Sequence, residues 1–131
     1  MNFKNVLIAS LVGAVVLMLT GYIIYVILLG DILTSSVATE PNMGLIFVGN
    51  IFGAGLLAYI YNRWASISTF NTGAMAGLVI GLLMGLYFDI MMLSTTSMLT
   101  TNGAILDVIG TGVMFSITGG VVGLVLGKLA S

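Results

Sequence analysis

Three polar side chains stand in otherwise apolar stretches and could do chemistry: Asp89, Asp107 and Asn50. Asp89 follows a run of glycines, and a helix rising about 1.5 Å per residue would place it about 24 Å from Gly73. A charge at that depth in a bilayer is costly unless it faces protein or water, or carries a proton. We expect Asp89 and Asp107 at comparable depth on neighbouring helices. Two such carboxyls could bind a cation or share a proton, with Asn50 lining the path.

Each carboxylate also has a structural interpretation. Asp89 could reach the lipid headgroups, or it could bond to backbone groups. Asp107 is expected in the first turn of a helix, where a negative charge interacts favourably with the helix dipole. The sequence leaves both interpretations open beside the chemical one.

The composition predicts that lipid, not water, surrounds the elements carrying these residues. Of the 131 residues, 60% are hydrophobic and 5% are charged, whereas soluble domains carry about 25% charged residues. The apolar runs reach the roughly 20 residues that a bilayer-spanning helix needs. We therefore expect an integral membrane protein, surrounded by membrane lipids, with residues 1–131 forming a single domain.

Missing residue types exclude several classes of function. The chain has no Cys and no His, which excludes thiol nucleophiles, zinc sites built on Cys or His, and Ser-His catalysis. With three basic residues in all, it offers no surface for nucleic acid. We expect no catalytic residues, no metal ion and no other cofactor.

The hydrophobic pattern predicts an all-α protein with four transmembrane helices, at about residues 6–29, 43–61, 73–93 and 105–126. The segment before the third helix is short and polar, and Ser68 or Thr69 could cap that helix. A polar loop over residues 31–42 joins the first two helices.

The two halves of the chain align without gaps in two places, residues 11–25 on 75–89 and residues 55–66 on 120–131. The halves could therefore be two helical hairpins related as a parallel repeat.

Glycines recur every four residues ahead of Asp89, and residues four apart in a helix share a face. The third predicted helix carries one such stripe and the fourth carries a second, together Gly73, Gly77, Gly81, Gly85, Gly119, Gly123 and Gly127. Small residues let membrane helices approach closely. We expect these faces to pack within one chain or in a homo-oligomer, against the fourth helix or the Gly13 and Gly21 face of the first. The alternative is a cavity or a groove for lipid tails.

The few charges sort by position along the chain. Four alternating spans place Lys4, Arg63 and Lys128 on one side, with Trp64 in an aromatic belt beside them, and Asp31, Glu40 and Asp107 on the other. Positive residues favour the cytoplasmic side. We therefore expect a multi-pass protein, of a bacterial inner membrane, with both termini in the cytoplasm.

Several segments resemble a family of small bacterial membrane proteins known as a domain of unknown function. The resemblance rests on residues 21–25 near the end of the first helix, on residues 56–64, and on residues 72–74 with the glycines from Gly77 to Gly85. It covers about half of the chain. It implies four membrane spans and no established activity.

Three functions remain open at this point. The first is a non-enzymatic packing, scaffold or interaction role. The second is a small proton- or cation-coupled transporter or channel that uses Asp89, with Asp107 beside it and Asn50 along the path. The third is a lipid-binding protein or an enzyme acting on lipid, for which the sequence offers no catalytic constellation.

Overall fold

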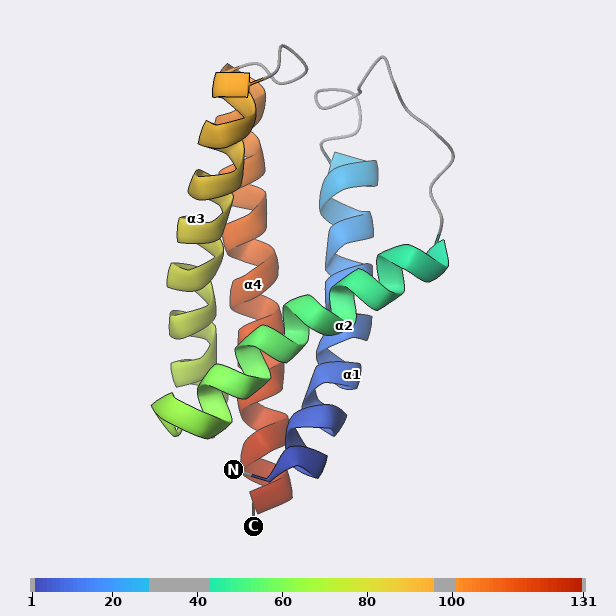
Figure 1. Ribbon diagram of the computed structural model, residues 1–131, viewed down its shortest axis with the longest axis vertical. Coiled ribbons are helices and arrows are strands. Elements are labelled where there is room, and N and C mark those ends of the chain that lie inside the picture. Colours follow the sequence, from blue (N-terminus) through green and yellow to red (C-terminus); the bar gives the residue numbers. More distant parts are fainter. Residues whose placement is uncertain (1, 29–42, 96–100, 131) are drawn as a thin grey trace.

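A computed structural model shows four long helices (Figure 1) and describes residues 2–28, 43–95 and 101–130. Helix α1 is Phe3–Gly21 and continues as the π-helical segment η1 (Tyr22–Leu28). Helix α2 is Met43–Ile60 and continues as the π-helical segment η2 (Tyr61–Ala65), and the chain ends with α3 (Phe70–Thr95) and α4 (Thr101–Ala130). All four are long and apolar enough to cross a membrane. The prediction of an all-α protein with four spans is confirmed.

The helix ends differ from the predicted ones in two informative places. Helix α3 begins at Phe70 because Thr69 caps it, its Oγ1 accepting a hydrogen bond from the Thr72 amide at 3.3 Å. Helix α4 begins at Thr101, so Asp107 lies beyond the first turn, which holds no acidic residue. The prediction that Asp107 serves the helix dipole from the first turn is therefore wrong. The predicted loop over 31–42, with Asp31 and Glu40, lies outside the described residues.

The four helices form two antiparallel hairpins of different shape (Figure 1). Helices α3 and α4 lie side by side along their length, whereas α2 crosses α1 obliquely and ends near the start of α3. Both termini lie at the same end of the molecule. The parallel repeat of the two hairpins stays a prediction.

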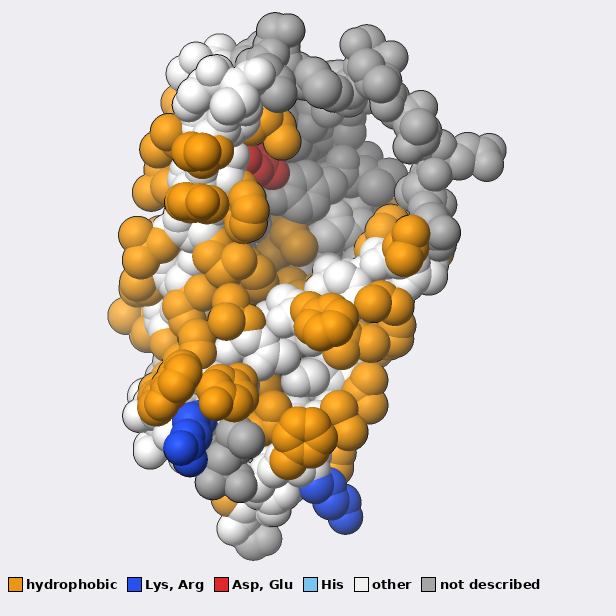
Figure 2. Space-filling model, viewed as in Figure 1, with side chains coloured by type: hydrophobic (Ala, Val, Ile, Leu, Met, Phe, Trp, Pro, Cys, Tyr) orange, Lys and Arg blue, Asp and Glu red, His pale blue; other side chains and the backbone are white. Residues whose placement is uncertain are grey.

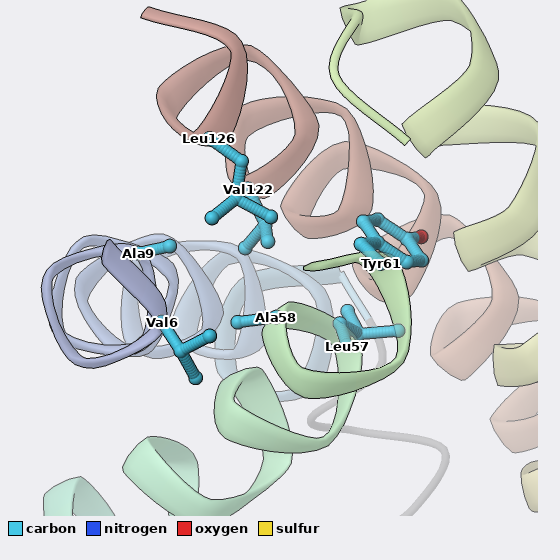
Figure 3. Close-up of a cluster of buried hydrophobic side chains, with 7 residues drawn as sticks. All are labelled: Val6, Ala9, Leu57, Ala58, Tyr61, Val122 and Leu126. Carbon is cyan, nitrogen blue, oxygen red and sulfur yellow. The ribbon is translucent and has the colours of Figure 1, made fainter. Parts of the chain in front are cut away.

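A compact core lies at the end of the molecule that holds the termini (Figure 3). It consists of side chains from α1, α2, η2 and α4, namely Val6, Ala9, Leu57, Ala58, Tyr61, Val122 and Leu126. The buried Tyr61 hydroxyl donates a hydrogen bond to the Gly73 carbonyl at 2.7 Å. A methyl group at Gly119 would come within 2.6 Å of that hydroxyl. The core thereby holds the first turns of α3 in place.

Basic and acidic side chains occupy different levels of the molecule. Lys4, Arg63 and Lys128 are exposed near the start of α1, the end of η2 and the end of α4, which meet at one end of the bundle. Trp64 is exposed beside Arg63, with its ring edge-on to Tyr59 at 5.2 Å between centroids. Figure 2 shows acidic side chains further up, in a hollow. The charges are thus sorted along the long axis.

Candidate functional site

The glycine stripe of α3 faces α4 and brings the two backbones together. Gly73, Gly77, Gly81 and Gly85 are all buried. A methyl group at Gly81 would lie 2.7 Å from the Phe115 Cβ, and one at Gly77 would clash with the Phe115 carbonyl. Asp89, the next step of four along the stripe, is only 5% exposed. The stripe therefore carries a carboxyl into the contact between two helices.

The glycines of α4 complete this contact from the other side. A methyl group at Gly119 would lie 3.0 Å from the Gly77 Cα, and one at Gly123 would lie 2.5 Å from the Thr69 carbonyl. A methyl group at Gly127 would clash with the carbonyl of Ser68, which lies in the segment before α3. The glycines thus pack within one chain, and the partner of the stripe is α4. The Gly13 face of α1 packs instead against Ala54 of α2 and Val122 of α4.

Asp89 meets Asp107 well inside the ends of their helices. Each is six residues from the nearer helix end, at Thr95 and Thr101, or about 9 Å along the axis. The Asp89 and Asp107 side chains are within hydrogen-bonding reach of each other. Since a carboxylate only accepts hydrogen bonds, a bond between two carboxyls requires a proton on one of them. The two carboxyls can therefore bond to each other only when one of them is protonated.

One carboxyl oxygen of Asp89 is buried without a hydrogen-bond partner among the described residues. Asp89 Oδ2 is fully covered and has no hydrogen-bond partner among the residues that the structure describes. Leaving a buried polar atom unpaired costs about 1–3 kcal/mol. The fold therefore tolerates a costly carboxyl at this position.

Both carboxyls line a groove of about 260 Å³ beside the α3–α4 contact. Asp107, Thr111 and Phe115 follow one another at intervals of four on α4, and Met84 and Phe88 close the groove from α3. Figure 2 shows acidic atoms inside a hollow next to α3. They belong to this pair, because Asp89 and Asp107 are the acidic residues within the described ranges. The groove therefore combines two carboxyls with mostly apolar walls.

The groove lies on the side of α4 that α1 also approaches. Asp107 precedes Met114 by seven residues, which places both on one face of α4. A methyl group at Gly21 of α1 would lie 3.3 Å from the Met114 Cε. On the other side of Asp89, a second groove of about 260 Å³ is lined by apolar side chains such as Leu86, Ile90 and Ile105. Asp89 thus separates an acidic groove from an apolar one.

The structure does not bring Asn50 to this site. Asn50 is half-buried on α2, and it lines neither groove. Within the described ranges no three Asp, Glu, His or Cys side chains gather as metal ligands would. Sequence reasoning missed Phe88, Thr111 and Phe115, although counting in steps of four from Asp107 would have found the two on α4.

Comparisons with known proteins give no relative from which a role for these residues could be inferred. No protein-family model matches the chain, and neither a curated protein nor a solved structure matches it. The resemblance to a family of small bacterial membrane proteins stays a prediction.

Proposed function

We propose that this chain is a small multi-pass membrane transporter or channel in which Asp89, together with Asp107, binds a proton or a cation. The observation that carries the proposal is the buried Asp89 Oδ2, without a hydrogen-bond partner among the described residues. Buried polar atoms are nearly always paired, so an unpaired one calls for an explanation. A bound cation would supply the missing partner, and a proton would remove the charge from this oxygen.

The chemistry of the pair supports binding and release. With one proton, the two carboxyls satisfy each other through a hydrogen bond. Without it, two negative charges stand close together in apolar surroundings, and like charges that share a site disfavour the doubly ionised state. A cation entering the groove relieves this repulsion. The pair can therefore exchange a proton for a cation.

Flux into proteoliposomes tests the proposal. We expect the wild-type chain to carry protons or an inorganic monovalent cation down a gradient, and Asp89→Asn to lose at least about nine-tenths of that flux. Asn keeps the size of Asp and removes the charge. The two proteins are compared at equal folded content, judged by elution as a single species. Wild-type flux that persists unchanged in Asp89→Asn, or no flux in either protein, would refute the proposal.

A packing or scaffold role is the second candidate. It is supported by the backbone contacts that the glycines of α3 and α4 make along their length. In that role Asp89 would be only the polar end of a packing face. The same experiment separates the two functions, because a scaffold shows no flux.

We further propose a membrane and an orientation. The basic end of the molecule, with Lys4, Arg63 and Lys128, would face the cytoplasm together with both termini, as positive residues do in membrane proteins. The resemblance stated above favours a bacterial inner membrane. Large apolar side chains remain exposed on every helix, and they would face lipid or further copies of the chain in a homo-oligomer.

A further inference from the structure

We infer that the groove beside Asp89 and Asp107 takes a small organic cation, an ammonium ion carrying an apolar group. This inference rests on the proposed function, since it names the class of ligand that the carboxyl pair binds. The aromatic and other apolar side chains that line the groove beside its two carboxyls support this inference.

The walls of the groove suit an organic cation better than a bare metal ion. Hard metal ions such as Ca²⁺ take 6–8 oxygen ligands. Apart from the two carboxyls and the Thr111 hydroxyl, the side chains that line this groove are apolar, those of Met84, Phe88 and Phe115. Aromatic faces attract ammonium groups, and more strongly where water is excluded. The groove thus provides charge for the ammonium and apolar walls for its substituents.

The position of Phe88 leaves its ring available for such a contact. Its side chain is 58% exposed while lining the groove. The Tyr87 ring stands edge-on to it, with centroids 5.4 Å apart and planes at 82°, an arrangement that aromatic pairs prefer. Phe88 therefore lies at the mouth of the groove, where a ligand from the membrane would first meet it.

The volume of the groove limits the size of the ligand. At about 260 Å³, it lies just below the roughly 300–1,000 Å³ of pockets for drug-sized molecules. A single aromatic ring with an ammonium substituent is the expected scale. Because Asp89 Oδ2 is covered in the structure, the ligand would reach it through a rotation of the Asp89 carboxyl group, whose terminal torsion is broad and roughly two-fold.

Equilibrium binding of benzyltrimethylammonium to the full chain in dodecyl maltoside tests the inference. The control ligand is neopentylbenzene, which has the same shape and no charge. We expect saturable binding of the cation, and only partitioning into micelles of the neutral compound. Asp89→Asn should weaken binding at least about tenfold, and Phe88→Leu about threefold. Phe52→Leu, the same change at an exposed position of α2, should leave binding unchanged.

The outcomes separate the inference from the proposed function. Equal binding of the two ligands, or binding unaffected by Asp89→Asn, would overturn the inference. If inorganic flux depends on Asp89 and benzyltrimethylammonium does not bind, the proposed function stands and the inference falls. If the cation binds at Asp89 and no flux is seen, the inference stands and the transport function falls.

Discussion

Replacing Gly77 with Leu is expected to drive α3 and α4 apart and to unfold the half of the molecule that they form. A side chain at this position meets the Phe115 carbonyl, and its Cβ would lie 3.2 Å from the Gly119 Cα. Backbone atoms cannot rotate away as a flexible side chain can. Overpacking of a close contact costs about 1–3 kcal/mol or more, and we expect a value at or above the top of that range. Thermal unfolding in detergent, followed by circular dichroism, measures the loss.

The chain offers a matched control for this change. A methyl group at Gly49 on α2 would meet nothing within 4 Å. Gly49→Leu should therefore leave stability unchanged or raise it slightly, because Leu favours a helix over Gly by up to about 1 kcal/mol. If both variants melted at the wild-type temperature, the result would contradict the close packing of α3 against α4.

Replacing Asp89 with Asn is expected to make the protein more stable. The change removes an ionisable group that is buried beside a second carboxyl, that of Asp107. The Asn amide could instead donate a hydrogen bond to Asp107. Since a hydrogen bond to a charged group contributes about 1.5–3 kcal/mol, we expect a gain of about 1–2 kcal/mol in unfolding free energy. A parallel loss of flux would mark Asp89 as a residue kept for function at the expense of stability.

Asp107→Asn is the control for this second change. It is the same chemical replacement at a half-buried position on α4, where solvation relieves part of the cost. We expect a smaller change in melting temperature than for Asp89→Asn. A clear loss of stability in Asp89→Asn would instead indicate that the carboxyl is a structural anchor, as a scaffold role predicts.

The helices and the burial of Asp89 could be predicted because each rests on local spacing. Hydropathy over about 20 residues identifies a membrane span, and steps of four place Asp89 on the face of Gly73 to Gly85. The partner of that face could not be chosen, because Gly13 and Gly21 of α1 offer a similar surface. The partner depends on how all four helices pack, and in the structure the glycine face of α3 packs against α4.

The acidic groove could be predicted only in part. Asp89 and Asp107 were expected at similar depth, and the structure brings them within hydrogen-bonding reach. Asn50 was expected to line the path beside them, but it lines neither groove next to Asp89, and α2 crosses α1 obliquely (Figure 1). The crossing angle of a helix depends on the side chains at its contacts, so it could not be derived from the pattern of one chain. Phe88 and Phe115 were missed because aromatic residues in membrane helices usually signal packing alone.

Labelling by dicyclohexylcarbodiimide tests most directly whether Asp89 is a carboxyl that ligands can reach. This apolar reagent adds to protonated carboxyl groups, and peptide mass spectrometry locates the adduct. We predict that Asp89 is labelled in the folded protein and that benzyltrimethylammonium slows the labelling. The chain unfolded in dodecyl sulfate provides the reference for full access. Asp89 that stays unlabelled in the folded protein, while reacting once the chain is unfolded, would contradict the proposed binding site.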